Sequence, residues 1–264
     1  MSYAAELYEN FMVPGLFAPW SAHLLQIAKP QPGERVLDVA CGTGIVARQF
    51  ARHSGPQGVI IGLDIDPNKI EVARLMAARE GLAIEWKTGP AERLPFPDAS
   101  FDLLICQFGL MFFSDRHAAL MEMHRVLKTN GRVVLSAWQG LDRHPFYQTL
   151  DNVSRRRLGK SSVGAVFSLG DADEIRTLLT NAGFEDVAIE SMSITARYSN
   201  PQEFLAWEID VDPAETPALK NLDAEAQKAI LKSLHEEMQA PLQDVTKDNE
   251  VVLPSHAHIA HARR

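Results

Sequence analysis

The distribution of apolar and polar residues divides the chain into two stretches with different patterns. Up to about residue 138, short apolar runs alternate with segments whose apolar residues recur at helical spacing. This alternation predicts a parallel sheet that helices bury on both faces. The predicted strands are 35–39, 58–63, 83–86, 101–107 and a run ending at Ala137, and the predicted helices are 44–53, 67–81 and 114–127, the last capped by Ser114.

The second stretch is richer in helical patterns. Residues 139–170 are predicted to be irregular or helical, and a following helix should end at Gly183. Asn200, Pro201 and Glu203 have the pattern of an N-cap, a first helical residue and a capping-box partner. The sequence therefore predicts one sheet domain with helical insertions late in the chain. The remaining predicted elements are a helix over Leu222–Met238 and strands at 187–195 and 251–261.

Composition and charge narrow the functional classes. The 264 residues are enough for one large α/β domain, or for one domain with a cap. The net charge of -8 argues against non-specific binding to nucleic acid or anionic lipid. No apolar run approaches the ~20 residues of a membrane span, and the N-terminus lacks a signal-peptide pattern. We expect a cytoplasmic protein without a nucleic-acid partner, a membrane span or a metal; the oligomeric state stays open.

A glycine-rich turn, LDVACGTG at residues 37–44, follows the first predicted strand. Gly42, Gly44 and Ala47 fit a loose G-x-G-x-x-A dinucleotide fingerprint, which is weak evidence alone. Asp38 changes the interpretation, because its carboxylate would repel a diphosphate by on the order of 1 kcal/mol or more at short range. S-Adenosylmethionine instead has a sulfonium and an ammonium that Asp38 would attract. Its carboxylate could bind the amides of the following helix.

The second strand also favours an adenosine-containing cofactor. It ends in IIGLDIDP, and Asp64 lies 22 residues after Gly42. This is close to the spacing of an acid that accepts both ribose hydroxyls. Asp66, which precedes Pro67, is better explained as a helix N-cap.

Four segments in order resemble the successive motifs of class I S-adenosylmethionine-dependent methyltransferases. The similarity is closest to the branch with the ubiquinone/menaquinone C-methyltransferases and many small-molecule methyltransferases. It covers about residues 33–138, and LLTNAGFEDVAIE extends it to the late strands. The segment YENFMVPGLFAPW resembles the N-terminal helical cover of such enzymes. The four segments are VLDVACGTG, GLDIDPNKIEVAR, AERLPFPDASFDLLICQFGLMFF and HRVLKTNGRVVLSAW.

The resemblance implies an α/β, Rossmann-like fold. The sheet should have seven mostly parallel strands, one of them antiparallel, with helices on both faces and helical cap insertions. The whole chain, 1–264, is then a single methyltransferase domain. Its expected parts are an N-terminal helical cover (1–32), a cofactor-binding core (33–138), cap insertions (139–170 and 199–245) and late strands (184–196 and 250–262).

Carried over by position, the resemblance also implies cofactor contacts. The family usually has an acid just before the Ala91-Glu92 pair, where this chain has Pro90. Proline offers neither a carboxylate nor an N–H, so the adenine amine would need a backbone carbonyl or Glu92. The expected contacts are Asp38, Ala40, Gly42, Thr43 and Gly44 at the methionine side, Asp64 at the ribose, Ile65 at the adenine, Ala91 and Glu92 in the adenine loop, and Gln107 and Phe108 at the methyl-donor end.

The acceptor is expected to be small and apolar or aromatic, methylated on O, C or N by in-line displacement. Alignment and water exclusion are then the chief tasks of the protein. A phenolic acceptor would benefit from a base, for which His144 is the candidate, with a surface histidine as the alternative. Aromatic residues in insertions more often belong to a core. The candidate pocket residues are Met111, Phe112, Trp138, Phe146 and Tyr147.

Two other functional classes stay open at this point. An NAD-type oxidoreductase could use the same glycine turn, although Asp38 disfavours it. A non-catalytic protein that binds S-adenosylmethionine would also retain the turn. A nucleic-acid methyltransferase is disfavoured, because QFGLMFF stands where an Asn/Asp-Pro-Pro-Tyr-type motif would follow the fourth strand.

Overall fold

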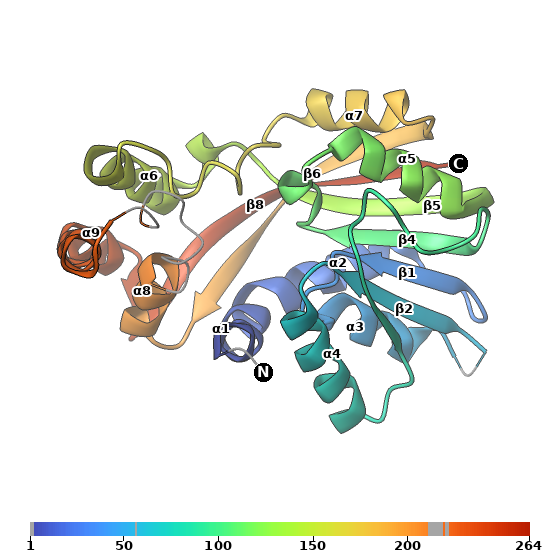
Figure 1. The fold of residues 1–264 in the computed structure, drawn as a ribbon, viewed down its shortest axis with the longest axis horizontal. Coiled ribbons are helices and arrows are strands. Elements are labelled where there is room, and N and C mark those ends of the chain that lie inside the picture. The colour runs from blue at the N-terminus through green and yellow to red at the C-terminus, as the bar shows by residue number, and fades with distance from the viewer. Residues whose placement is uncertain (1–2, 56, 211–218, 220–221) are drawn as a thin grey trace. The chain divides into compact units, whose positions relative to one another are not determined.

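The computed structural model describes residues 3–55, 57–210, 219 and 222–264. The chain forms two compact units (Figure 1). Unit 1 comprises Met1–Gln139, Leu169–Met192 and Ala257–Arg264, and unit 2 comprises Gly140–Ser168 and Ser193–His256.

A mostly parallel sheet has the strand order β3-β2-β1-β4-β5-β8-β6. Neighbours from β3 to β5 pair in parallel, and β8 pairs antiparallel with β5. The expected mixed sheet is therefore confirmed; the two-residue β7 (Thr246–Lys247), paired with β8, makes it eight-stranded. The other strands are β1 Arg35–Val39, β2 Val59–Asp64, β3 Glu85–Thr88, β4 Phe101–Gln107, β5 Leu127–Trp138, β6 Glu185–Tyr198 and β8 Glu250–Arg263.

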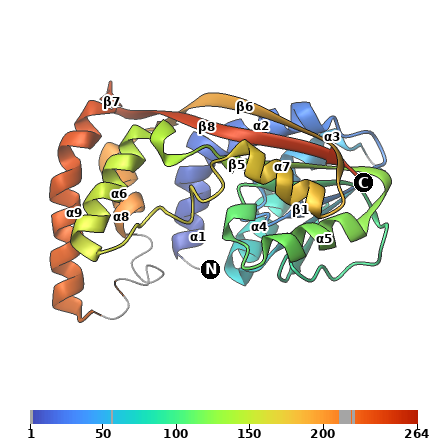
Figure 2. The ribbon, with the colours of Figure 1, turned by 90° about the horizontal axis from the view of Figure 1, so that it is seen from above.

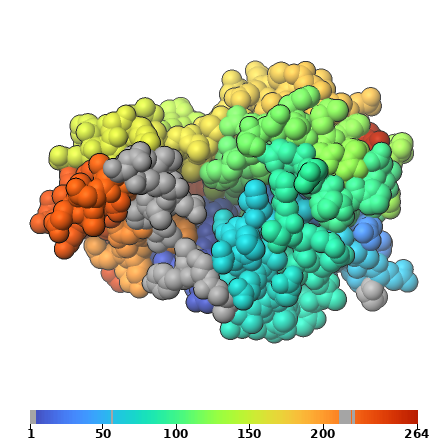
Figure 3. Space-filling model, viewed as in Figure 1, coloured from blue at the N-terminus to red at the C-terminus, as the bar shows by residue number. Residues whose placement is uncertain are grey.

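Helices cover both faces of the sheet in unit 1. Seen from above, α2 and α3 lie on one face, and α5 and α7 lie on the other (Figure 2). In the space-filling view, atoms of α4 and the segment after it form much of the visible face of this unit (Figure 3). The helices are α1 Tyr3–Leu7, the π-helix η1 Tyr8–Phe17, α2 Ala18–Ala28, α3 Ile45–His53, α4 Pro67–Arg79, the 3-10 helix η2 Leu110–Phe112, α5 Arg116–Val126 and α7 Ala172–Asn181.

Local capping explains where two of these helices begin. Asp66 caps α4 as predicted, because its side chain accepts the Asn68 amide N–H at 2.8 Å. The cap of α5 is Asp115, which accepts from Ala118, and the predicted cap Ser114 was wrong by one residue. Burial on both faces explains the continuous apolar runs; β4, for example, has Leu103, Leu104 and Ile105 fully buried.

Unit 2 is mainly helical. It contains the 3-10 helix η3 Leu141–Arg143, α6 Pro145–Leu158, α8 Pro201–Asp210 and α9 Ala224–Asp244. The last three lie side by side (Figures 1 and 2). Asn200 caps α8 as predicted, since its side chain accepts the amides of Gln202 and Glu203. Among the residues that the structure describes, no helix is long and apolar enough to cross a membrane.

Candidate functional site

The glycine turn after β1 is a left-handed bend that leads into α3. Ala40, Gly42 and Gly44 have φ of 56°, 55° and 85°, and Gly44 is the N-cap of α3. A Cβ on Gly44 would lie 2.3 Å from the ring of Trp86 on β3. Glycine is therefore needed at this position both for the backbone conformation and for the close approach of an indole.

Asp38 lies below this turn and is almost completely buried. Its Oδ2 accepts the Ala47 amide N–H from the first turn of α3 at 3.0 Å. Its Oδ1 has no hydrogen-bond partner among the described residues. Burial raises the pKa of Asp38 to about 8, the Ala47 amide opposes this shift, and the nearby Asp64 charge adds to it. The carboxyl is thus largely protonated at pH 7 unless a positive charge lies beside it.

Asp64, at the end of β2, joins the glycine turn to the second strand. Its Oδ2 accepts the Gly42 amide N–H at 2.7 Å, and its Oδ1 accepts the Asp66 amide N–H at 2.9 Å. Each carboxylate oxygen has a second lone pair, so Asp64 can still accept hydroxyl groups. Asp38, Asp64 and Gly42 therefore lie together at the carboxyl ends of β1 and β2.

Three polar atoms at the carboxyl ends of these strands are buried without hydrogen-bond partners among the described residues. They are Asp38 Oδ1, Thr43 Oγ1 and Gln107 Oε1. The amide nitrogen of Gln107 is already used, since it donates to the Phe17 carbonyl at 3.2 Å. Buried polar atoms without partners are rare in native structures. This set fits the amino-acid end of S-adenosylmethionine, because the two acceptors suit an ammonium and the Thr43 hydroxyl suits a carboxylate.

The N-terminal π-helix η1 contacts the same turn. Ring and hydroxyl atoms of Tyr8 lie 3.9 Å from where a Cβ on Gly42 would be. A buried ion pair joins η1 to α3, with Glu9 Oε1 and Arg48 Nη2 2.6 Å apart. Arg48 also donates to the Thr43 carbonyl at 2.8 Å. The sequence did not predict this pair; a glutamate close to the apolar residues of the segment YENFMV was a signal for it.

The predicted adenine side has mixed properties. Ile65 is 70% exposed directly after β2, as a residue that covers a flat ligand would be. Glu92 is engaged elsewhere, because its Oε1 accepts from the amide and hydroxyl of Ser114. Partial burial alone would raise the pKa of Glu92, but the hydrogen bonds from Ser114 outweigh it and hold this pKa below its usual range. Ala91 beside it is buried.

Of the two residues predicted at the methyl-donor end, Phe108 belongs to an aromatic cluster that also contains the predicted pocket residue Trp138. Phe108 and Trp138 stack with ring centroids 3.6 Å apart, and Trp20 meets both edge-on. Met111 is buried, whereas Phe112 is 58% exposed. These contacts favour a packing role for Trp138, and its place in an acceptor pocket stays a prediction.

His144, Phe146 and Tyr147 belong to unit 2. Both ring nitrogens of His144 are engaged: Nδ1 lies 3.2 Å from the Gly140 carbonyl, and Nε2 accepts the His256 amide N–H at 3.2 Å. Burial is the main cause that lowers the pKa of His144. These hydrogen bonds favour a structural role, and catalysis by His144 stays a prediction.

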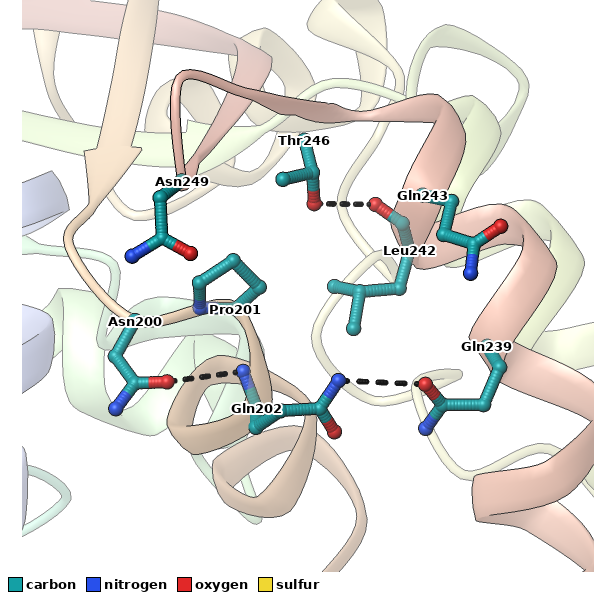
Figure 4. Close-up of a pocket in the computed structure, with 8 residues that line it drawn as sticks. All are labelled: Asn200, Pro201, Gln202, Gln239, Leu242, Gln243, Thr246 and Asn249. Atoms are coloured by element: carbon teal, nitrogen blue, oxygen red, sulfur yellow. Dashed lines mark hydrogen bonds between the residues drawn. The ribbon is translucent and has the colours of Figure 1, made fainter.

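A separate hollow of about 330 Å³ lies in unit 2 and is drawn in Figure 4. Its described lining residues carry no charge, and several of their polar atoms already pair with one another. Gln202 donates to Gln239 at 3.3 Å, and Thr246 donates to the Leu242 carbonyl at 2.7 Å. Its lining residues are Asn200, Pro201, Gln202, Gln239, Leu242, Gln243, Thr246 and Asn249.

Comparisons with known proteins agree with this geometry. A methyltransferase-domain family profile matches residues 37–135. The ubiquinone/menaquinone biosynthesis C-methyltransferase UbiE of Burkholderia cenocepacia is 30% identical over 204 residues, covering 71% of this chain and 82% of the relative. UbiE of Cupriavidus metallidurans is 34% identical over 142 residues. The match covers 52% of this chain and 58% of that relative, so the chain spans less than two thirds of the length of that relative.

A solved structure extends the similarity to most of the fold. The YcgJ protein of Bacillus subtilis has a TM-score of 0.60 at 22% identity, covering 92% of this chain and 97% of that chain. At this identity the likeness concerns the fold alone. Together with the UbiE relatives, the glycine turn and the acids at the strand ends, it leads to one conclusion: the chain belongs to the class I S-adenosylmethionine-dependent methyltransferases, in the branch similar to UbiE.

Proposed function

We propose that this enzyme transfers a methyl group from S-adenosylmethionine to a small, apolar or aromatic acceptor, releasing S-adenosylhomocysteine. The names of its relatives, which refer to C-methylation in ubiquinone/menaquinone biosynthesis, favour a quinone-type ring as the acceptor. The proposed substrate is a small molecule and not a nucleic acid, which agrees with the net charge of -8. A cytoplasmic location is part of the same proposal.

The cofactor placement rests mainly on three buried polar atoms at the carboxyl ends of the strands that have no hydrogen-bond partner among the described residues. Asp38 Oδ1 and Gln107 Oε1 would accept hydrogen bonds from the ammonium, and Thr43 would donate to the carboxylate. A dinucleotide would bring a diphosphate to the same place, where the Asp64 carboxylate would oppose it and a neutral Asp38 would contribute no attraction. The arrangement therefore supports a cationic ligand better than a nicotinamide dinucleotide.

The other predicted cofactor residues would act by shape and by hydrogen bonding. Asp64 would accept the ribose hydroxyls, and Ile65 would cover the adenine. Gly42 and Gly44 would let the backbone approach the ligand closely. We include Ala40, Ala91, Glu92 and Phe108 as proposed contacts on the strength of their positions in the motifs.

Catalysis in this proposal depends on alignment more than on covalent chemistry. Bound S-adenosylmethionine supplies an electrophilic methyl group on a sulfonium. The protein would orient the acceptor and exclude water. Residues 33–138 would supply the cofactor-binding core of a single methyltransferase domain, and 139–170 with 199–245 would form the cap insertions, with Met111, Phe112, Trp138, Phe146 and Tyr147 as proposed pocket residues.

Two measurements test this proposal in sequence. Titration calorimetry with S-adenosylhomocysteine should show saturable binding, with NADH as the negative control. Incubation with S-adenosylmethionine and a panel of phenols, quinols, thiols and amines should then yield S-adenosylhomocysteine by mass spectrometry. Binding of NADH alone would overturn the cofactor assignment. Tight S-adenosylhomocysteine binding without turnover on any acceptor would favour a non-catalytic protein.

A further inference from the structure

Unit 1 buries a complete ion pair beside the glycine turn. The side chain of Arg48 on α3 is 2% exposed, and that of its partner Glu9 on η1 is 6% exposed. The second carboxylate oxygen, Glu9 Oε2, is buried without a hydrogen-bond partner among the described residues. Because both charges lose their hydration, a buried pair of this kind is weak evidence for a gain in stability. The pair therefore calls for a role other than stability.

The guanidinium of Arg48 connects three separate parts of unit 1. Its Nη1 donates to the Thr43 carbonyl at 2.8 Å, and its Nη2 donates to Glu9 Oε1 at 2.6 Å. Its Nε lies 3.1 Å from Oε1 of Glu80, the C-cap residue of α4. The planar, rigid guanidinium keeps these contacts in a fixed geometry. Arg48 thus ties the glycine turn to η1 and to the end of α4.

The peptide group between Thr43 and Gly44 is held from both sides. Its carbonyl accepts from Arg48, and its N–H, which belongs to Gly44, donates to the Cys41 carbonyl at 2.9 Å. Because a peptide group is planar, these two bonds fix its orientation. The Thr43 side chain starts from this fixed backbone, and its Oγ1 is the buried hydroxyl proposed above to donate to the cofactor carboxylate. The position of that hydroxyl therefore depends on Arg48.

The helix that supplies Glu9 is unusual. It is a ten-residue π-helix with Pro14 inside it, and π-helical geometry is rare and frequent at functional sites. It continues into α2, which packs against α3 on one face of the sheet (Figure 2). Glu9 is the one charged residue in the η1 sequence YENFMVPGLF. An apolar side chain there would be buried without losing hydration, so the bond to Arg48 best explains the carboxylate.

We propose that Arg48 is a positioning residue for S-adenosylmethionine. It fixes the Thr43–Gly44 peptide group so that the Thr43 hydroxyl meets the cofactor carboxylate, and Glu9 holds the guanidinium in the orientation that this requires. The inference rests on the proposed function, which supplies the ligand of the turn. Arg48 acts through Thr43 and touches none of the reacting atoms.

The double variant Glu9→Leu/Arg48→Met separates positioning from stability. Replacing a buried ion pair by apolar residues of similar volume is often neutral for stability or favourable, so urea denaturation should resemble that of wild type. The Thr43 carbonyl loses its donor, however. The calorimetric dissociation constant for S-adenosylhomocysteine should therefore rise about tenfold, near the low end for a lost hydrogen bond to a charged group. KM for S-adenosylmethionine should rise in parallel, while kcat at saturating cofactor stays within about threefold.

Two single variants complete the experiment. The matched control is Arg52→Met, one turn further along α3, which removes a more exposed ion pair with Glu80 and should bind as wild type does. Arg48→Lys keeps the charge beside Glu9, but one ammonium does not reproduce the rigid fork of the guanidinium. This variant should fold and still bind S-adenosylhomocysteine several times more weakly, and it decides the question if the double variant does not fold.

The inference fails if a folded double variant binds S-adenosylhomocysteine with an affinity within about twofold of wild type. It fails equally if that variant shows a lower binding stoichiometry with an unchanged dissociation constant, because the pair would then act on folding alone. Where only Arg48→Lys can be measured, wild-type affinity in that variant would overturn the inference. A wild-type protein that binds no S-adenosylhomocysteine would instead refute the proposed function itself.

Discussion

The protonation of Asp38 leads to a quantitative prediction about cofactor binding. With a pKa of about 8 in the ligand-free protein, the carboxyl must lose its proton before it can pair with a cationic ligand. If the bound pKa falls below about 5.5, the dissociation constant should be about 25-fold larger at pH 6.5 than at pH 8.5, or about 1.9 kcal/mol. Binding should therefore release a proton near neutral pH.

The same group should affect folding stability in the ligand-free protein. The folded pKa lies above that of the unfolded chain, so between about pH 4 and pH 8 the folded state holds a proton that the unfolded state has lost. Stability is therefore greatest at low pH and falls as the pH rises through the folded pKa. From pH 6 to pH 8 the loss should be on the order of 2 kcal/mol.

Asp38→Asn isolates both effects. Asparagine can still accept the Ala47 amide hydrogen bond, but it has no proton to exchange. Calorimetry should show weaker S-adenosylhomocysteine binding whose pH dependence comes from the amino group of the ligand alone. Urea denaturation should show a difference between variant and wild type that grows from pH 6 to pH 8. Parallel pH curves for the two proteins in both assays would refute the reasoning.

Three further substitutions test the site by different routes. Gly44→Ala should lose about 2–5 kcal/mol of stability in urea denaturation, because of the positive φ and the overlap of the new Cβ with Trp86. The control is Gly81→Ala, where φ is 67° and a Cβ would enter open space, so the loss should be only about 1–2 kcal/mol. Equal losses in the two variants would contradict the steric argument. Asp64→Ala should weaken calorimetric cofactor binding by ~1–3 kcal/mol through loss of charge-assisted hydrogen bonds, and an unchanged affinity would remove Asp64 from the site. Pro90→Asp should tighten cofactor binding in the same assay, because the new carboxylate could accept a hydrogen bond from the adenine amine. Weaker binding would contradict the interpretation that this position lacks an acceptor for the adenine amine.

Local pattern was sufficient for much of the sheet domain. The strands at 35–39 and 101–107 were predicted with the boundaries that the structure has, because apolar runs between helices are typical of strands buried on both faces. The cap of α5 shows where local reasoning stops. Ser114 and Asp115 are both good caps, and Ser114 is used instead to bind Glu92, 22 residues earlier in the chain.

The features missed in the site depend on contacts between distant residues. Glu9 and Arg48, for example, are 39 residues apart. No spacing rule connects such pairs, because only the fold brings them together. The raised pKa of Asp38 is a similar case, since the sequence shows a carboxylate at a strand end but not how deeply the surrounding chain buries it.

The order of segments in the two units has a practical consequence for engineering. Unit 2 is made of two stretches, 140–168 and 193–256, and each is flanked on both sides by chain that belongs to unit 1. Four backbone junctions therefore connect the units, and Met1 and Arg264 both belong to unit 1. A chimera that exchanges unit 2 with that of a relative must transplant both stretches together, and a deletion that starts at Met1 or at Arg264 removes part of unit 1 before it reaches unit 2.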